Sequence, residues 1–418
     1  MMHGNLRIDA QALWADLIYT AQFGGTPKGG VKRLTLTPED RAVRDWFAAT
    51  CSDLGCSITV DTMGNMFARR AGLDDSLPPI TMGSHLDTQP TGGKFDGILG
   101  VLAGVAVVRA LEDARYVTRH PVEIINWTNE EGSRFSPPMM CSGVFAGVFE
   151  ESEVLEKRDR AGFRFGDELV AIGYKGEEPC GRHPMTAYFE LHIEQGPILE
   201  AEKNVIGAVS GVQGMKWYEV TVRGKDAHAG STPMHMRRDA LLAASHMVVA
   251  LAKVVARFGH EAVGTVGLLE NRPNSNNVVP GETFFTVDIR HPDDAVVCEI
   301  EKKFIDCFEN IASDMGVLLS ISRIWDAPAV RFDERCVGLV RQAAEQIGLS
   351  PYSIVSGPGH DAAYVARLAP TAMIFVPCKD GLSHNEEESI TEYEAEAGAN
   401  VLLGSILKAD EFFGNKFK

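Results

Sequence analysis

Five side chains of kinds that bind metal ions lie at the ends of strand-like runs or in polar and glycine-rich turns. They are three histidines and two carboxylates, namely His85, Asp96, Glu131, His192 and His384. Imidazole and carboxylate ligands together suit Zn²⁺, and Mn²⁺, Co²⁺ and Ni²⁺ compete for such sites. One bridging carboxylate with two further ligands for each ion would leave positions open for water and substrate. The set therefore predicts two divalent metal ions, with Zn²⁺ favoured.

The stretch from Gly83 to Asp96 carries two of these residues between a strand and a helix. The apolar run 79–82 predicts a short buried strand, and 97–108 predicts a helix. In an extended chain His85 and Asp87 lie on one side, so Asp87 could hold the His85 ring as an outer-shell carboxylate. Open α/β sheets usually place their binding sites at such turns. The alternative is a capped helix beside a core histidine.

Two adjacent glutamates, Glu130 and Glu131, follow the next predicted strand, 122–127. Like charges side by side repel unless a cation or a proton lies between them. Adjacent side chains also point in different directions, so one can bind a metal while the other faces a water. The alternative is a solvated acidic loop. A third predicted strand, 188–191, ends at His192.

Bulk composition narrows the class of protein. The 418 residues suffice for two domains, and 45% hydrophobic with 23% charged residues is typical of a globular protein. A formal net charge of −17 argues against nucleic acid or anionic membrane as a partner, and any anionic substrate needs a local Arg or Lys. The eight scattered cysteines lack a CxxC pair and favour reduced thiols. No export signal or membrane span is predicted, and a cytoplasmic location is the resulting expectation.

The order of the predicted elements indicates two domains. Alternating strands and helices over 1–213 and 327–418 predict one α/β domain that is interrupted in the sequence. Between them, 214–326 predicts the order βαββαβ of a small ferredoxin-like domain. Its predicted strands are 216–223, 263–270, 283–290 and 317–324, and its predicted helices are 237–258 and 294–315. The α/β domain is predicted to hold a helix within 1–25, helices 38–54, 334–348 and 391–408, a hairpin of 57–61 with 65–68, and strand 371–376.

Together these motifs resemble the di-zinc amidohydrolases of the aminoacylase/carboxypeptidase superfamily, from about residue 80 to the end of the chain. Within that group the chain is similar to N-carbamoyl-L-amino-acid hydrolases and β-ureidopropionases (β-alanine synthases). Each motif alone is weak, and jointly they are specific. They are 83–90, 93–97, 129–132, 190–197, 228–234, 288–292, 359–361 and 380–385.

The resemblance implies a metal-dependent exopeptidase-like catalytic domain with a mixed central sheet, and an inserted domain used for dimerisation and as a lid. It implies that Asp96 bridges two metals, that His85 and His192 bind one, and that Glu131 and His384 bind the other. Glu130 would be the general base, taking a proton from water and passing it to the leaving nitrogen. A homodimer through the insert, with hinges near 211–214 and 326–328, is expected.

The resemblance also implies the groups that bind substrate. Arg290 would clamp a carboxylate, although a surface salt bridge is the commoner fate of an arginine. His228 and His360 would stabilise the oxyanion. Gln195, Asn277 and Gly359 would complete the polar contacts. Gln195 and Asn277 could instead only form turns, and Asn276 is the alternative to Asn277.

The implied reaction removes the carbamoyl group of N-carbamoyl-L-α-amino acids or N-carbamoyl-β-alanine, giving the amino acid, CO₂ and NH₃. The substrate is thus a small ureido compound with a carboxylate. The alternative on the same scaffold is an allantoate or ureidoglycine amidohydrolase. A peptidase is a weaker alternative, because peptidase relatives typically have a carboxylate where His192 stands. A metal-binding scaffold without catalysis is disfavoured, since all five ligands and Glu130 are present.

Overall fold

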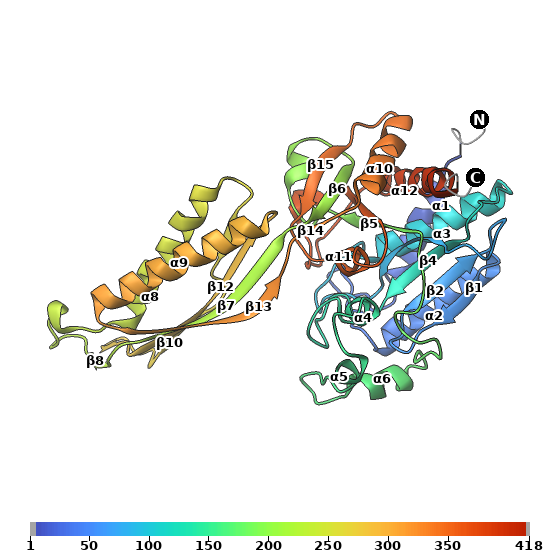
Figure 1. Ribbon diagram of the computed structural model, residues 1–418. Helices are drawn as coiled ribbons and strands as arrows, with labels where there is room; N and C mark the ends of the chain where they lie inside the picture. Colours follow the sequence, from blue (N-terminus) through green and yellow to red (C-terminus); the bar gives the residue numbers. More distant parts are fainter. Residues whose placement is uncertain (1–5, 415–418) are drawn as a thin grey trace. The chain divides into compact units, whose positions relative to one another are not determined.

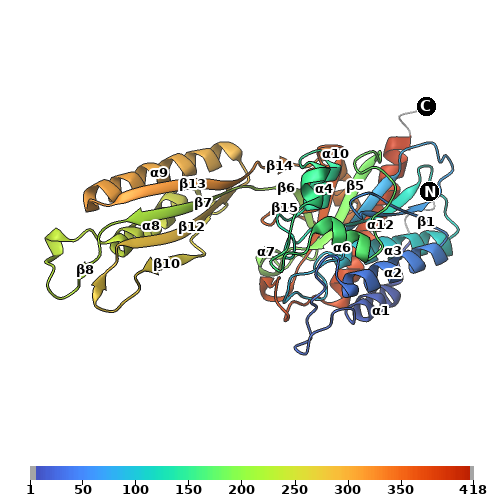
Figure 2. The same cartoon turned by 90° about the horizontal axis from the view of Figure 1, so that it is seen from below.

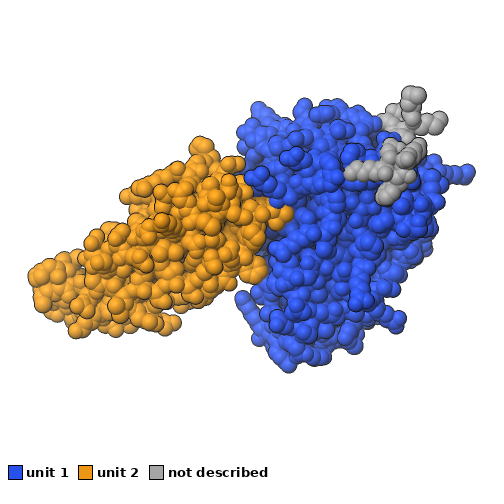
Figure 3. All heavy atoms as spheres, viewed as in Figure 1, with its two compact units in different colours: residues 1–211, 331–418 blue, residues 212–330 orange. Residues whose placement is uncertain are grey.

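The computed structural model describes residues 6–414, which divide into two compact units (Figure 3). The first unit comprises residues 1–211 and 331–418, and the second comprises residues 212–330. The predicted insert, 214–326, lies within the second unit. The chain thus enters the second unit once and leaves it once.

A nine-stranded mixed sheet forms the centre of the first unit (Figure 1). Its order is β1-β2-β4-β3-β5-β16-β6-β14, and β15 also pairs with β6. The mixed α/β architecture predicted from the sequence is therefore confirmed. The strands are β1 (Ser57–Val60), β2 (Met66–Arg70), β3 (Ile80–His85), β4 (Val122–Trp127), β5 (Ala187–Ile193), β6 (Gly207–Val212), β14 (Val330–Arg331), β15 (Tyr352–Ser356) and β16 (Thr371–Val376).

Four central strands of this sheet run in the same direction. β3 pairs in parallel with β4 and with β5, and β16 pairs in parallel with β5. Their carboxyl ends therefore meet at one edge of the sheet, where ligands bind in open α/β sheets. The segments that leave this edge are 86–96, 128–131, 194–195 and 377–384. Every predicted metal ligand lies in one of these segments or at the strand end before it.

Helices cover both faces of the sheet because successive side chains of a strand point to opposite sides. Leu191 of β5 packs against Gly398 of the last helix, whereas Glu190 accepts a hydrogen bond from Ala362 N of a short helix. His192 lies on the same face as Glu190. The main helices of this unit are α1 (Ala10–Thr20), α2 (Pro38–Asp53), α3 (Ile98–Asp113), α4 (Met140–Phe145), α5 (Glu151–Leu155), α6 (Phe165–Ala171), α7 (Ile198–Ala201), α10 (Glu334–Gln346), α11 (Asp361–Val365) and α12 (Glu392–Gly414).

The second unit is a five-stranded antiparallel sheet with α8 and α9 packed on one face (Figure 2). The strand order is β10-β12-β7-β13, and β9 also pairs with β12. The predicted strand 263–270 is in fact two short strands, β9 and β10. Elements are β7 (Gly214–Arg223), β8 (Ala227–His228), α8 (Ala240–Val255), β9 (Val263–Thr265), β10 (Leu269–Arg272), β11 (Val278–Val279), β12 (Glu282–His291), α9 (Asp294–Met315) and β13 (Leu318–Ala327).

The segment 240–258, which includes α8, is apolar and long enough to cross a membrane by length and composition alone. One apolar face of this helix has partners inside the second unit, because Met247 and Leu251 are buried in one cluster with Val220 and Phe285. The core of this unit thus accounts for the apolar face of α8. None of the eight cysteines, all of which lie within the described residues, forms a disulfide.

Three strands of the first unit were not predicted, namely β6, β14 and β15. β6 has the sequence Gly-Ala-Val-Ser-Gly-Val, which lacks the alternation of apolar and polar residues that marks a half-buried strand. β14 has only two residues. These strands form by pairing with other strands of the sheet. The local sequence pattern does not predict such pairing.

Candidate metal centre

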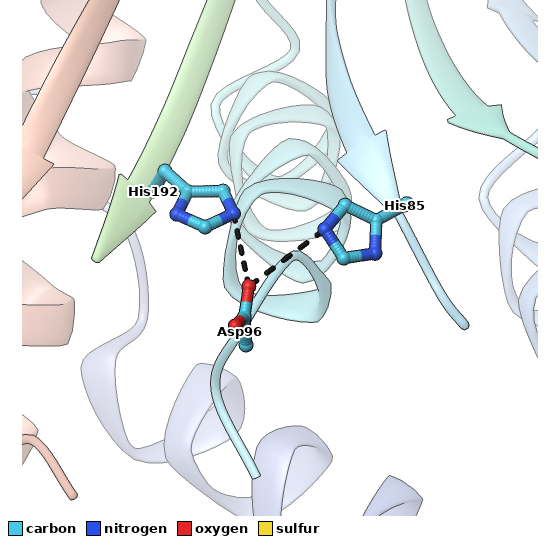
Figure 4. Close-up of side chains that lie close together, drawn as sticks. All are labelled: His85, Asp96 and His192. Carbon is cyan, nitrogen blue, oxygen red and sulfur yellow. Dashed lines mark ion pairs between the residues drawn. The ribbon is translucent and has the colours of Figure 1, made fainter. Parts of the chain in front are cut away.

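Three predicted ligands converge at the carboxyl edge of the first unit's sheet (Figure 4). His85 ends β3, His192 lies on β5, and Asp96 lies in the turn before α3. Asp96 Oδ1 is 3.2 Å from His192 Nε2 and 3.8 Å from His85 Nε2. All three side chains are buried. Their ligand atoms lie close enough together to hold one ion.

The other two predicted ligands gather around the second oxygen of the same aspartate. His384 Nε2 lies 3.6 Å from Asp96 Oδ2 and 3.5 Å from Glu131 Oε2. Asp96, Glu131 and His384 form a second group that can hold an ion. The His384 side chain is 52% exposed, unlike the other four. Asp96 thus faces one pair of ligands with each oxygen, and the cluster is open to solvent on the side of His384.

The histidine tautomers fit a cation at this position. His85 Nδ1 lies 2.9 Å from Asp87 O, and His192 Nδ1 lies 2.9 Å from Ile193 O. A carbonyl oxygen can only accept, so each Nδ1 carries a hydrogen, and in the neutral ring that binds a metal each Nε2 presents a lone pair. Within residues 6–414, the buried His192 Nε2 has no hydrogen-bond partner. Lone pairs that face a carboxylate oxygen repel it unless a cation lies between them, so the donor set fits metal.

The predicted role of Asp87 requires a correction. The backbone carbonyl of Asp87, and not its carboxylate, makes the hydrogen bond to the His85 ring; Asp87 Oδ1 is 3.8 Å from His85 Nδ1. The carboxylate instead accepts from Glu130 N at 3.2 Å and from Glu131 N at 3.4 Å. Burial, and then the charge of Asp40, raises the pKa of Asp87 to about 7. Asp87 therefore orients the turn that carries both glutamates.

Glu130 lies beside the cluster without belonging to either ligand group. Its Oε2 is 3.5 Å from His85 Nε2, and its backbone carbonyl accepts from Met139 N at 2.6 Å. Burial, followed by the charges of Asp361 and Glu131, raises the pKa of Glu130 well above its usual value. A carboxylate held in this way accepts a proton readily, as a general base must.

Acidic crowding distinguishes this edge of the sheet from the rest of the first unit. Burial and then the charge of Asp96 raise the pKa of Glu131 well above its usual value. Burial acts to raise the pKa of Asp96 as well, but the three imidazoles around it, His192 first, outweigh burial and lower that pKa. Divalent cations would neutralise these carboxylates, so metal and fold stabilise each other.

His360 and Gly359 lie next to the cluster. The His360 ring is 4.5 Å from the His192 ring, and His360 Nε2 lies 3.0 Å from Ser356 Oγ. Burial, and then the charge of His192, holds the pKa of His360 well below its usual value, so the ring is neutral. A side chain at Gly359 would press on Met139, whose Cε lies 2.8 Å from the position of an added Cβ.

Gln195 also lies at this centre, beside a ligand. Its Nε2 donates to Asp96 Oδ2 at 2.8 Å and to Ser383 Oγ at 3.1 Å. Gln195, Asn129 and His384 all have positive φ angles, between 55° and 59°. Non-glycine residues seldom adopt this left-handed conformation, and such strain gathers at functional sites. Three of the segments at the sheet edge therefore hold a strained residue.

The remaining predicted contacts, His228, Asn277 and Arg290, belong to the second unit. β8 pairs with β11, which places His228 opposite Val278, next to Asn277. His228 Nδ1 accepts from Gly230 N at 3.1 Å and from Ser231 N at 3.2 Å. Its Nε2 therefore carries the hydrogen and is an outward donor.

Arg290 on β12 is half-buried and forms a two-point ion pair with Asp288. The nearest approach is 2.8 Å, from Arg290 Nη2 to Asp288 Oδ2. The guanidinium is thus held by a carboxylate of its own strand. Asn276 and Asn277 are both exposed, and the pairing of β8 with β11 involves the carbonyl of Asn277, which accepts from Ala229 N.

Three polar residues that the sequence analysis did not assign to the site touch its ligands. Gln89 Nε2 donates to Glu131 Oε2 at 2.6 Å, and Ser383 Oγ donates to Asp96 Oδ2 at 2.7 Å. Glu388 accepts from the backbone of Asp96. Gln89 and Ser383 lie inside the motifs quoted above. Glu388 ends an acidic run, which in the sequence resembles a solvated loop.

Comparison with known proteins identifies the family of this chain. Residues 81–408 match peptidase family M20/M25/M40. An N-carbamoyl-L-amino-acid amidohydrolase of Rhizobium meliloti is 47% identical over 407 residues, covering 97% of this chain and 98% of that protein. An allantoate amidohydrolase of Bacillus subtilis is 33% identical over 392 residues, covering 93% of this chain and 95% of that protein.

A solved structure extends the likeness to the fold. The amidase of the hydantoinase/carbamoylase family from Burkholderia multivorans is 51% identical, with a TM-score of 0.94 over 97% of this chain and 98% of that chain. At this coverage the match extends over both units. The chain therefore belongs to peptidase family M20/M25/M40, among its hydantoinase/carbamoylase amidases, and is a hydrolase of amide bonds.

Proposed function

We propose that this protein is a metal-dependent amidohydrolase that removes the carbamoyl group from N-carbamoyl-L-amino acids, giving the amino acid, CO₂ and NH₃. The observation that carries the proposal is the position of Asp96, whose two oxygens each face a separate pair of ligands. The relative from Rhizobium meliloti, named for this activity, supports the choice of substrate.

We propose two Zn²⁺ ions as the resident metals, one held by His85 and His192, the other by Glu131 and His384, with Asp96 shared. When bound, they would polarise the ureido carbonyl and make water more acidic. The Nδ1 contacts of His85 and His192, which leave both Nε2 atoms for a metal, support this assignment. Metal analysis of the purified protein tests it, and a content near one ion per chain would contradict it.

Glu130 acts as the general base in this proposal. It takes a proton from the attacking water and returns it to the leaving nitrogen as the carbon–nitrogen bond breaks. Its raised pKa favours the first transfer, and its separation from both ligand groups leaves its oxygens free of a metal. Neutral His360 and the amide of Gln195 line the same edge and would contact the substrate or its developing negative charge.

The second unit would supply the groups that recognise the rest of the substrate. We assign to Arg290 the carboxylate of the amino acid, because a guanidinium binds a carboxylate at two points, as it binds Asp288 here. His228 would donate from Nε2 to the carbonyl oxygen, beside Asn277. The ferredoxin-like unit would act as a lid hinged near 211–214 and 326–328. Small-angle scattering that stays unchanged when product is added would argue against a moving lid.

We also propose that the protein is a cytoplasmic homodimer that pairs through the second unit. The edge strands β10 and β13 expose Leu269 and Leu318, and exposed apolar edges invite pairing. Leu318→Lys should yield a monomer by light scattering. Leu73→Lys is the matched control in the first unit, since both leucines are 75% exposed. An unchanged mass for Leu318→Lys would contradict an interface at β13.

One assay tests the reaction and its alternative together. Release of ammonia from N-carbamoyl-L-methionine, N-carbamoyl-β-alanine and allantoate is compared with and without a chelator. We expect turnover of the carbamoyl amino acid that chelation abolishes. Turnover of allantoate alone would favour the activity for which the Bacillus subtilis relative is named. Metal-loaded protein that turns over none of the three would favour a scaffold without catalysis.

A further inference from the structure

We propose that Glu388 is a positioning residue that locks together the two chain segments carrying Asp96 and His384; the inference rests on the metal centre proposed above. Glu388 Oε1 accepts two backbone hydrogen bonds, from Phe95 N at 3.0 Å and from Asp96 N at 3.1 Å. These are the amides of the turn that presents the shared ligand. One carboxylate oxygen therefore fixes the direction in which Asp96 leaves the backbone.

The second oxygen of Glu388 reaches the other segment. Ser383 Oγ lies 3.1 Å from Glu388 Oε2 and 2.7 Å from Asp96 Oδ2. Ser383 precedes His384, the one ligand whose side chain is half-exposed. Glu388 thus joins the backbone of one ligand to the neighbour of another, although Asp96 and Glu388 are 292 residues apart in the chain. An exposed ligand needs such a support more than a buried one does.

The residues around Glu388 confine its side chain to one position. Its side chain is buried, with 3% of the residue exposed. A Cβ added at Gly93 would lie 2.1 Å from Glu388 Oε1, so the carboxylate fills the space that a side chain at 93 would take. Residue 93 therefore has to be glycine for Glu388 to reach the two amides. Partners that orient metal ligands commonly contribute as much as about 10- to 100-fold in metal affinity.

The test measures zinc affinity directly, by competition between the full-length protein and a chromogenic chelator for Zn²⁺ alone. Glu388→Ala should weaken the affinity by about 10- to 100-fold. Glu388→Gln should stay close to the unsubstituted protein, because its amide oxygen still accepts and its NH₂ can donate to Ser383 Oγ. Gly93→Ala, which pushes on the same carboxylate from the other side, should resemble Glu388→Ala.

Asp410 is the matched control, because it is also a buried carboxylate that accepts two backbone amides. It binds Arg119 N and His120 N, each at 2.8 Å, and is 6% exposed. Arg119 and His120 are not among the proposed metal ligands. Asp410→Ala should lower the melting temperature and leave zinc affinity unchanged.

Unchanged zinc affinity in Glu388→Ala, or an equal loss in Asp410→Ala, would overturn the inference. If Glu388→Ala does not fold, Glu388→Asp decides, since its shorter side chain cannot span both segments and should also weaken zinc binding. An unsubstituted protein that binds no Zn²⁺ would instead remove the proposed metal centre itself. The two failures are therefore distinguishable.

Discussion

The two units hold their functional side chains in different ways. In the first, His85, Asp96 and His192 are buried and converge from separate segments at one sheet edge. In the second, His228 is exposed in a short ladder and Arg290 is half-buried beside Asp288. The first arrangement is costly without a cation, because it gathers desolvated carboxylates. The second is stable by itself, because each group already has a local partner or water.

This difference separates two kinds of contribution to the reaction. Groups in the first unit should control metal content and the chemical step, because they are fixed before the substrate arrives. Groups in the second unit should control substrate binding, because they exchange water or a local partner for the ligand only when the substrate binds. Substitutions in the two units should therefore give different kinetic and metal-binding results.

The largest effect is expected for Glu130→Gln. Removing a general base costs about 10²- to 10⁴-fold in turnover, and glutamine has the same shape but no basic oxygen. Metal content should stay intact, since Glu130 is outside both ligand groups. Glu131→Gln is the informative neighbour and should lower metal content as well. Ammonia release measures turnover, and elemental analysis measures metal content. Loss of metal from Glu130→Gln would contradict the proposal that Glu130 is a base and not a ligand.

Arg290→Ala should have the next largest effect, in the second unit. A hydrogen-bonded charge contributes about 1.5–3 kcal/mol, which corresponds to a rise of about 10- to 100-fold in KM for a carboxylate substrate. Turnover and metal content should change little. Arg223→Ala is the control, because Arg223 lies in the same sheet and pairs with Glu282 at 2.8 Å. Steady-state kinetics that are identical for both variants would show that Arg290 is not the clamp.

The smallest effect concerns pH and the metal-free protein. Burial, and then the charge of Asp40, raises the pKa of Asp87 to about 7. Burial, and then the charge of Asp96, raises the pKa of Glu388 to about 8. The folded state therefore keeps these protons to a higher pH than the unfolded chain does. Their contribution to the free energy of unfolding is fully present below about pH 4 and is lost as the pH rises through about 7 for Asp87 and about 8 for Glu388.

His85 acts in the opposite direction, because burial lowers its pKa to about 4. The contribution of His85 to the free energy of unfolding changes only between about pH 4 and 6.5, so it is constant at higher pH. Calorimetry of chelator-treated protein should show a melting temperature that falls from pH 6.5 to 8.5. Bound Zn²⁺ should remove the fall. A melting temperature that rises over this range without metal would contradict the assignment of these carboxyl groups.

Much of the centre was predictable because its residues have unusual types for their positions. His85 and His192 lie at or near the ends of strands, and Glu130 and Glu131 follow one. Parallel strands bring their carboxyl ends to one edge. The sequence could not indicate that the carbonyl of Asp87, and not its carboxylate, contacts His85. That choice depends on the turn conformation, in which the carboxylate is satisfied by the amides of Glu130 and Glu131.

Glu388 shows where sequence reasoning stops. Nothing in its acidic run distinguishes a buried support from a solvated charge, and its partners Phe95 and Asp96 are far away in the chain. The strands β6 and β15 are similar cases, because they form by pairing with distant residues. Local periodicity reports which face of an element is apolar, and it carries no information on such pairings.

By itself, the sequence predicted the ligand chemistry, most of the strands and helices, and a division into an α/β part and an inserted part. Those properties depend on residue type and on short-range spacing. Only the tertiary structure decided that each oxygen of Asp96 faces its own pair of ligands, and that Glu388 holds the segments that present them. The reason is physical: hydrogen bonds and metal ligation require atoms within about 3 Å of each other. For residues hundreds of positions apart, only the folded sheet provides that proximity.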